Sequence, residues 1–154
     1  MKKLAELNVQ YDGRIGALAG PLAFARTVSA IEQSLARGET EMPGRGTLSA
    51  CGAVFSKMSV LHDGTMVPCD MIPTLTMGVI GTRSLQDAWL ISPEINALRH
   101  RREIALSTLP ECNGCRYVGF CTGGCPASVM SASGRLIGIN PLTCYRSYAE
   151  RGGK

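Results

Sequence analysis

Residues 112–126 read CNGCRYVGFCTGGCP, a stretch that holds Cys112, Cys115, Cys121 and Cys125 in the spacing C-x2-C-x5-C-x3-C. Thiolates are soft ligands that select iron-sulfur clusters, zinc and copper(I), and a C-x2-C pair lets one loop offer two sulfurs to one metal centre. Three more cysteines lie outside this stretch, at positions 51, 69 and 144. Seven thiols grouped in this way predict a metal-binding domain.

A disulfide framework is the main alternative use of so many cysteines. It needs an oxidising compartment, usually an even cysteine count and a small secreted chain. The count here is odd, and Lys2 and Lys3 are followed by Leu-Ala-Glu-Leu-Asn instead of the apolar core of a signal peptide. We therefore expect a cytoplasmic protein. We expect no membrane contact, because the weakly polar stretch 15–25 contains Pro21 and is shorter than the ~20 apolar residues of a membrane span.

The composition indicates one domain plus an appendage, with a small core. Of the 154 residues, only 5% are aromatic and 18 are glycine, so metal centres would supply much of the stability. The formal net charge of +4 is mild. The basic run Arg99-His100-Arg101-Arg102 predicts a solvated helix face in preference to an anion or peptide contact, because no aromatic residues are interleaved with it. We expect no nucleic-acid partner.

The residues before the first cysteine predict a linker helix. From Pro21 to Arg37, apolar residues recur at helical spacing, Pro21 suits a first helical turn and Gly38 suits a C-terminal cap. Residues 39–50 then predict a loop. We accordingly divide the chain into an N-terminal tail and linker helix, residues 1–45, and a metal-binding domain, residues 46–154.

The segment between Cys51 and Cys69 predicts a β-hairpin. Residues 54–61 and 65–67 are strand-like, and His62-Asp63-Gly64 between them is typical of a tight turn. A hairpin would bring Cys51 and Cys69 to the same end, where their sulfurs could share a metal centre.

Short helices complete the expected fold. They are a helix capped by Ser84, a helix starting at Pro93, a helix over 126–133 that ends at Gly134, and a last helical turn opened by Cys144. The second of these should carry Ile95 and Leu98 inward. The fold class is α+β, with a small β-hairpin, short helices and cysteine-rich loops organised around two metal clusters.

Two kinds of metal centre fit the cysteines. Zinc takes four cysteine or histidine ligands, so seven cysteines plus His62 could make one all-cysteine site and one site of three cysteines and a histidine. Iron-sulfur clusters take four thiolates, so seven cysteines would fill one cluster and leave the other with three. The spacing favours clusters, because zinc ribbons usually show two matched C-x2-C pairs, whereas this run is crowded and ends in Cys125-Pro126.

The Cys-Pro ending also suggests how the ligands divide. In bacterial two-cluster ferredoxins, a closely spaced run ending in Cys-Pro sends its last cysteine to the other cluster. By analogy, Cys125 would join Cys51 and Cys69 at a first cluster. The second cluster would be held by the remaining cysteines, Cys112, Cys115, Cys121 and Cys144. Gly123 and Gly124 suit this geometry, because bare backbone can approach sulfur closely and donate N–H bonds to it.

The complete pattern resembles a known family. Cys51, twelve residues, Gly64, four residues, Cys69, then the run 112–125 and Cys144 resemble the seven-cysteine motif of SPASM domains. These are the C-terminal auxiliary-cluster domains of radical S-adenosylmethionine (radical SAM) enzymes. The resemblance covers roughly residues 46–150 and is strengthened by CTGGCP at 121–126. It implies two auxiliary [4Fe-4S] clusters with the ligands divided as above.

The chain departs from the family pattern in two respects. Radical SAM enzymes cleave S-adenosylmethionine at a cluster held by C-x3-C-x2-C, whereas the one C-x3-C step here, Cys121 to Cys125, is followed by Ser128 where a third cysteine is required. We therefore expect the C-terminal part of such an enzyme, whether a fragment, a split gene product or a stand-alone descendant. Some members also supply an extra cysteine near the start of the motif, but residues 1–50 contain none. The fourth iron of the first cluster should then be open or bound by another group.

The resemblance implies an auxiliary module of a radical SAM enzyme that modifies a peptide or protein, relaying electrons and helping to bind the substrate. Its partners would be a radical SAM core, on the same or another chain, and that substrate. S-adenosylmethionine would act only at the core. Two alternatives remain open at this point: a stand-alone two-cluster electron-transfer protein and a zinc-stabilised interaction module.

Individual polar and aromatic residues support weaker hypotheses. His62 is expected to be a turn residue more than a ligand. Asp70, beside Cys69, is expected to be a solvated loop residue within reach of the open iron. Tyr117 and Phe120 are expected to shield a cluster from water, which shifts its reduction potential.

Overall fold

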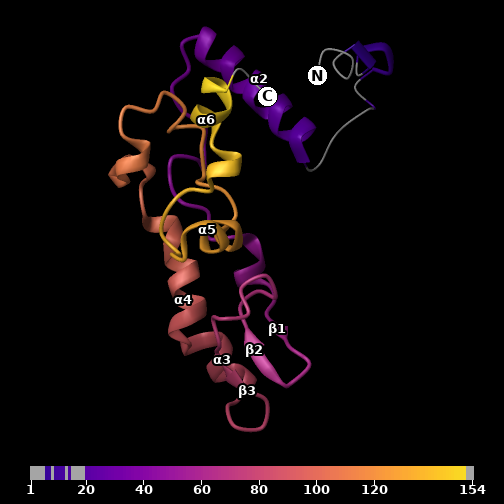
Figure 1. Cartoon of the computed structure of the whole chain (residues 1–154), viewed down its shortest axis with the longest axis vertical. Helices are drawn as coiled ribbons and strands as arrows, with labels where there is room; N and C mark the ends of the chain where they lie inside the picture. The colour runs from indigo at the N-terminus through magenta and orange to yellow at the C-terminus, as the bar shows by residue number, and fades with distance from the viewer. Residues whose placement is uncertain (1–5, 8, 13, 15–19, 152–154) are drawn as a thin grey trace.

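The computed structural model describes residues 6–7, 9–12, 14 and 20–151. Its α-helices are α2 (Gly20–Ala36), α3 (Leu85–Ile91), α4 (Pro93–His100), α5 (Pro126–Ser133) and α6 (Tyr145–Glu150). Its strands are β1 (Ser59–Val60), β2 (Thr65–Val67) and β3 (Gly78–Val79), and its 3-10 helices are η1 (Gly52–Phe55), η2 (Arg101–Glu103), η3 (Leu106–Thr108), η4 (Pro110–Cys112) and η5 (Pro141–Thr143). The molecule is long: α2 and α6 lie at one end, the sheet and α3 at the other, and α5 between them (Figure 1). The expected α+β class is confirmed.

Helix α2 confirms the predicted linker helix. Val28 and Ile31 are buried on its inner face, and Gly38, at a φ of +84°, follows the helix where a left-handed residue is favoured. The side chains of Leu22 and Ala25, also part of the predicted apolar face, lie outside the described residues. The division of the chain at residue 45 stays a prediction, although α2 packs against the later part of the chain.

The predicted hairpin is present as part of a larger sheet. Strand β2 pairs antiparallel with β1 and also with β3, in the order β1-β2-β3, with Thr65 opposite Val79. In the turn, Asp63 Oδ1 accepts a 2.9 Å hydrogen bond from the Thr65 N–H, and Gly64 has a φ of +85°. The sequence analysis missed β3, because a two-residue strand has too little alternation to be recognised.

The strand predicted over residues 54–61 is wrong in its first half. Residues 52–55 form the 3-10 helix η1, and only Ser59 and Val60 pair as a strand. Val54 is buried, and the Arg99 guanidinium donates a 3.0 Å hydrogen bond from Nε to the Val54 carbonyl. Helix α4 therefore packs against η1 and bonds to its backbone.

The helices after the sheet follow their predicted signals. Ser84 Oγ accepts a 3.0 Å hydrogen bond from the Asp87 N–H, as expected of an N-cap. Pro93 begins α4, and Ile95 and Leu98 are fully buried on its inner face. Helix α5 ends at Gly134, whose φ is +68°, and Cys144 directly precedes α6.

The basic run does not form the solvated face that the sequence predicted. Arg101 is only 1% exposed, and Arg99 is half-buried, with its guanidinium bonded to the Trp89 and Val54 carbonyls. His100 and Arg102 are exposed. Helix α4 buries one residue in three or four, so Arg101 follows Ile95 and Leu98 onto the inner face.

The predicted loop before Cys51 crosses the middle of the molecule. Gly46 N–H donates to the Cys121 carbonyl (2.9 Å), and Ser49 N–H donates to the Thr122 carbonyl (2.7 Å). Leu48 is 1% exposed between these contacts. The loop therefore ties the cysteine run to the residues that lead into Cys51.

Most of the buried apolar residues in the described part form three clusters of modest size, as the composition suggested. They are Ala50, Val54, Met66, Ile72, Met77, Ala88, Ile95, Leu98 and Ala127; then Leu48, Leu106, Leu109 and Cys112; and then Ile31, Tyr117 and Phe120. Cys69 packs against the first cluster, Cys121 against the second and Cys115 against the third. Among the described residues, no helix has the length and apolar character needed to cross a bilayer.

Candidate metal centres

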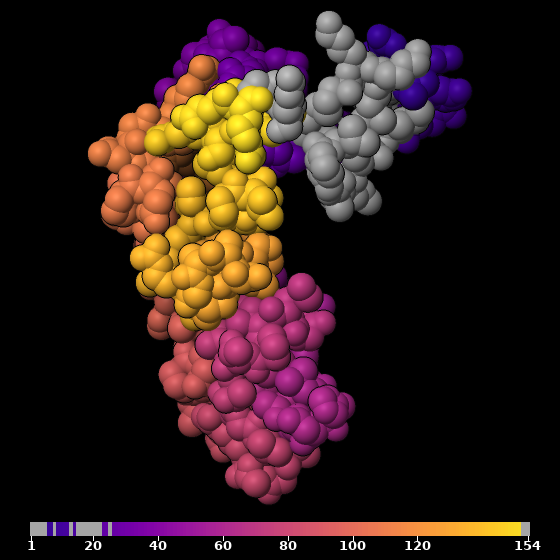
Figure 2. Space-filling model, in the orientation of Figure 1, coloured from indigo at the N-terminus to yellow at the C-terminus, as the bar shows by residue number. Residues whose placement is uncertain are grey.

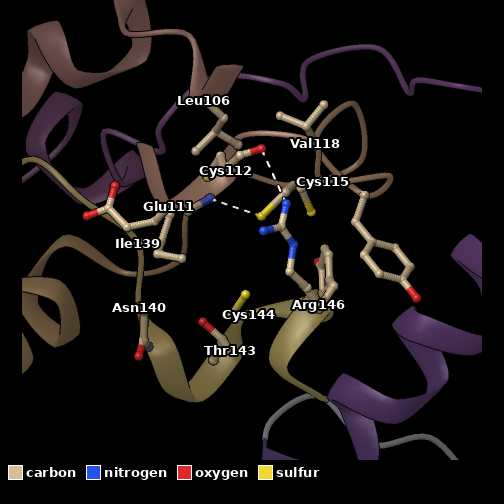
Figure 3. Close-up of a pocket in the computed structure, with 14 residues that line it drawn as sticks. Leu106, Glu111, Cys112, Cys115, Val118, Ile139, Asn140, Thr143, Cys144 and Arg146 are labelled. Carbon is tan, nitrogen blue, oxygen red and sulfur yellow. Dashed lines mark hydrogen bonds between the residues drawn. The ribbon is translucent and has the colours of Figure 1, made fainter. Parts of the chain in front are cut away.

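Four of the seven cysteines line one pocket, which we call the four-cysteine pocket. They are Cys112, Cys115, Cys121 and Cys144. Cys112 ends η4, Cys115 and Cys121 come from the loop that follows, and Cys144 caps α6. Figure 3 shows Cys144 across the pocket from Cys112 and Cys115. The empty space among its lining residues is about 370 Å³, its open mouth included.

The sulfurs of the four-cysteine pocket interact with one another. Burial raises the pKa of Cys112 to about 11, and the charges of Cys121, Cys115 and Cys144 raise it further. Burial also raises the pKa of Cys121, again with help from Cys144 and Cys115. Without metal the Cys112 and Cys121 thiols stay protonated at neutral pH, so metal binding to them must displace protons.

Gly123 fills the role that the sequence predicted for it. Its backbone N–H donates a 3.3 Å hydrogen bond to Cys121 Sγ. Its φ is +71°, and a Cβ built on it would lie 2.4 Å from Leu48 Cδ2. At Gly124 a Cβ would lie 2.9 Å from the Asn140 Cβ. Both positions thus require glycine for close packing, and Gly123 also supplies a donor to sulfur.

Arg146 and Tyr117 also line the four-cysteine pocket. Arg146 Nη2 donates hydrogen bonds to the Cys112 carbonyl (3.5 Å, Figure 3) and to the Asn113 carbonyl (2.7 Å). A hydrogen bond to Cys115 raises the pKa of the guanidinium. Tyr117 is buried and donates from its hydroxyl to the Glu32 carboxylate on α2. Burial, with that carboxylate, raises the pKa of Tyr117 to about 12. Helix α2 therefore reaches the wall of the pocket.

Aromatic stacking holds α2 and α6 together at this end of the molecule. The Phe24 ring stacks on Tyr145 at 5.3 Å between centroids and meets Tyr148 edge-on at 5.1 Å. Figure 2 shows the C-terminal segment, in yellow, lying against α2, in purple. Cys144 directly precedes α6, so these contacts fix its backbone.

The other three cysteines line a second pocket, the three-cysteine pocket. Cys51, Cys69 and Cys125 share it with apolar residues that include Leu98 and Ala127. Cys51 precedes η1, Cys69 lies two residues after β2, and Cys125 caps α5. The pocket has about 260 Å³ of empty space, its open part included. The hairpin and α5 bring these residues together from three separate segments.

The backbone at Cys51 is strained. Its φ is +65° with a ψ of 123°, a region that residues with a side chain seldom adopt. The Cys51 N–H donates a 3.1 Å hydrogen bond to Ser49 Oγ, which holds this conformation. Such outliers concentrate at functional sites, where surrounding structure over-determines them.

Asp70 and His62 are the two candidates for a further ligand near the three-cysteine pocket. Cys69 Sγ donates to Asp70 Oδ1 over 3.7 Å, and Asp70 is exposed. Burial raises the pKa of Cys69, and the charges of Asp70 and Cys125 raise it further. His62 is exposed in the hairpin turn, apart from the residues that line the pocket. Asp70 is therefore the better placed of the two.

The sequence analysis missed the buried arginine near this pocket. Arg101 Nε donates a 2.8 Å hydrogen bond to the Ser49 carbonyl. Its Nη1 and Nη2 atoms are buried and have no hydrogen-bond partner among the described residues. The spacing of Ile95, Leu98 and Arg101 could have indicated that Arg101 is buried, since residues three apart lie on one helix face.

All seven cysteines are free. Within the described ranges, no three His, Cys, Asp or Glu side chains converge closely enough to hold a single metal ion. A four-iron cluster needs no such point, because its thiolates bind different irons. The N–H donor at Cys121 and the unpartnered guanidinium nitrogens of Arg101 fit a cluster with sulfide acceptors.

The comparison with known families agrees with this chemistry. Residues 51–116 match the family model of SPASM, described as an iron-sulfur cluster-binding domain. The matched range includes Cys51, Cys69, Cys112 and Cys115, and the other three cysteines follow it. No curated protein and no solved structure matches the chain.

Proposed function

Since this chain contains a SPASM iron-sulfur cluster-binding domain, we propose that it binds two [4Fe-4S] clusters and serves as the auxiliary module of a radical SAM enzyme that modifies a peptide or protein. The observation that carries the proposal is the separation of the cysteines into a four-sulfur and a three-sulfur pocket. Cys112, Cys115, Cys121 and Cys144 hold the second cluster. Cys51, Cys69 and Cys125 hold the first.

The chain's own residues prepare both sites for one-electron transfer, which is the chemistry that iron-sulfur clusters supply when bound. In the four-cysteine pocket, Gly123 N–H donates to Cys121 and Arg146 lies beside Cys115, so both stabilise negative charge on sulfur. Buried Tyr117 contributes to the wall and limits the access of water. The hydrogen bonds from Gly123 and Arg146 favour the more negatively charged, reduced state.

The three-cysteine pocket is the proposed place for substrate. Three thiolates leave the fourth ligand position to another donor. The exposed Asp70 carboxylate beside Cys69 is one candidate, and a thiol, amine or carboxylate of the substrate is the other. This explains how the module would help to bind substrate as well as relay electrons.

The partners of the proposed function are a radical SAM core and a peptide or protein substrate, in a reducing cytoplasm. The sequence supports the need for a separate core, because the C-x3-C step at Cys121 and Cys125 has Ser128 where a third cysteine is required. We expect the purified chain to yield no 5′-deoxyadenosine from S-adenosylmethionine under reducing conditions. Formation of that product by this chain would contradict the assignment.

The proposal predicts about eight iron and eight sulfide per chain after anaerobic reconstitution, the sum for two four-iron clusters. Iron, sulfide and zinc analysis, with visible absorbance, checks it. About two zinc per chain without sulfide would favour the zinc-stabilised module instead. Two clusters in a chain that never copurifies with a radical SAM core would favour stand-alone electron transfer.

A matched pair of variants tests the division of ligands. Cys69 and Cys144 are both half-buried cysteines, one in each pocket. Cys69→Ala should alter the paramagnetic resonance signal of one reduced cluster and Cys144→Ala the signal of the other. Loss of the same signal from both variants would show that the two cysteines belong to one centre.

A further inference from the structure

Arg101 is the least expected residue near the three-cysteine pocket. It directly follows α4, is 1% exposed, and bonds through Nε to the Ser49 carbonyl. The helix before Arg101 and the segment to which it bonds both reach the pocket. Leu98, one helical turn before Arg101, lines the pocket, and so does Ala50, the residue after Ser49. Arg101 therefore lies directly behind the wall of this pocket.

Two nitrogens of the Arg101 guanidinium have no hydrogen-bond acceptor among the described residues. Only Nε is bonded, whereas Nη1 and Nη2 are buried and have no partner in the described part of the chain. An arginine keeps its positive charge in proteins, and buried N–H groups without acceptors are unfavourable. An anionic or strongly polar acceptor beside Nη1 and Nη2 of Arg101 would therefore remove an unfavourable feature of this site.

Cys125 lies within electrostatic reach of Arg101. Burial lowers the pKa of Arg101, and a negative charge on Cys125 opposes that change. Ser49 provides a second connection: its carbonyl accepts from Arg101, while its Oγ accepts from the Cys51 N–H. Arg101 is thereby linked to two of the three cysteines in the pocket.

We propose that Arg101 donates hydrogen bonds to sulfur on the Cys125 side of the first cluster and, as a buried positive charge, makes that cluster easier to reduce. The proposal rests on the cluster assigned above to Cys51, Cys69 and Cys125. Hydrogen bonds to sulfur and local charge are two of the factors that set a cluster's reduction potential. Arg101 is a positioning residue, since it acts through the cluster's sulfurs.

The first test uses the intact protein, so it does not depend on a variant that folds. Chain labelled with nitrogen-15 at the arginine guanidinium is reconstituted and reduced, and pulsed paramagnetic resonance is recorded on the first-cluster signal. We expect a weak nitrogen-15 coupling that disappears in Arg101→Lys and persists in Arg146→Lys, since Arg146 lines the other pocket. A first-cluster signal without this coupling, or a coupling that survives Arg101→Lys, would refute the role of Arg101.

The second test measures the reduction potentials of both clusters by redox titration. Arg101→Met, which removes the charge at similar length, should make reduction of the first cluster about tenfold less favourable, a shift of ~59 mV for one electron. The reduction potential of the second cluster should not change in Arg101→Met. As a control, Arg102→Met should leave the potential of the first cluster unchanged, because Arg102 is exposed and its guanidinium lies 5.0 Å from the Phe55 ring centre.

Equal potentials in wild type and Arg101→Met, or equal shifts of both clusters, would overturn the proposal. If Arg101→Met fails to bind the cluster, the nitrogen-15 coupling in the labelled wild-type protein still tests whether a guanidinium lies beside the cluster. Absence of any first-cluster signal in wild type would instead contradict the proposed function, so the two failures are distinguishable.

Discussion

At the scale of single residues, the four-cysteine pocket depends on glycine where a side chain would collide. Gly123 and Gly134 have nearly the same backbone conformation, with φ of +71° and +68°. A Cβ on Gly123 would lie 2.4 Å from the buried Leu48 side chain, whereas a Cβ on Gly134 would have nothing within 4 Å. The two glycines therefore separate the cost of a positive φ from the cost of crowding.

We predict that Gly134→Ala lowers the free energy of unfolding by about 1 kcal/mol, the cost of a left-handed alanine. Gly123→Ala should lower it by ~3 kcal/mol, because overpacking in a buried site adds to that cost. Denaturant unfolding of the anaerobically reconstituted proteins gives both values, and iron analysis should show loss only in Gly123→Ala. Equal effects of the two substitutions would mean that Leu48 moves freely and that the packing at Gly123 is unimportant.

At the scale of elements, α2 is fastened to the cysteine loop by one buried and one exposed interaction. Glu32 accepts a hydrogen bond from buried Tyr117 and forms a 3.0 Å ion pair with exposed Arg116. Exposed ion pairs contribute little, whereas a buried hydrogen bond to a carboxylate contributes more. The orientation of α2 on the pocket should therefore depend on Tyr117.

We predict that Tyr117→Phe lowers the free energy of unfolding by about 2 kcal/mol, and that Arg116→Gln, which removes the other contact to Glu32, lowers it by less than ~1 kcal/mol. Denaturant unfolding of the reconstituted variants measures both. An equal loss from the two substitutions would mean that burial of the Tyr117 hydroxyl is unimportant.

The pKa of Tyr117 adds a pH dependence to the same contact. Its folded-state pKa of about 12 lies above the ordinary value near 10. The folded chain thus retains a proton that the unfolded chain releases, so the Tyr117 contribution is complete below about pH 10 and is lost as pH rises toward about 12. Unfolding free energies measured across this range should fall more steeply in wild type than in Tyr117→Phe. Parallel slopes would contradict the assignment of the pKa.

At the scale of the whole molecule, stability depends on three small apolar clusters, each bordered by cysteine. Small cores seldom suffice for a domain without metal or disulfides, and the cysteines here are free. Metal binding energy should therefore be part of the folding energy. One link between the segment before Cys51 and the cysteine run is the pair of backbone hydrogen bonds from Gly46 and Ser49 to the Cys121 and Thr122 carbonyls.

We predict that removal of iron under anaerobic conditions opens this link first. Hydrogen exchange followed by mass spectrometry should show faster exchange at residues 46–50 and 119–125 in the iron-free chain. The hairpin turn, where Leu61 N–H bonds to the Thr65 carbonyl, should change less, since none of its residues lines either cysteine pocket. Unchanged exchange in both segments, 46–50 and 119–125, after complete iron removal would show that the fold does not depend on the clusters.

The sequence by itself determined the chemistry of this protein and its local elements. Soft thiolates in a crowded run predict metal binding, and caps at Ser84 and Gly134 begin and end helices through interactions within a few residues. The resemblance of the cysteine pattern to SPASM domains identified the family that the comparison then found at residues 51–116. Such features depend on spacing along the chain, so they can be read without the fold.

Only the tertiary structure decided which side chains share a pocket and which are buried. Cys51, Cys69 and Cys125 lie far apart in sequence and share a pocket beside Val54, Ile72 and Ala127, which pack in one apolar cluster. Residues 52–55 form a 3-10 helix that packs against α4, with the Arg99 guanidinium bonded to the Val54 carbonyl. Arg101 looked like part of a solvated basic face because charge alone favours exposure, but it follows the inner face of α4 and is buried. Contacts between distant segments, more than local propensity, set these outcomes.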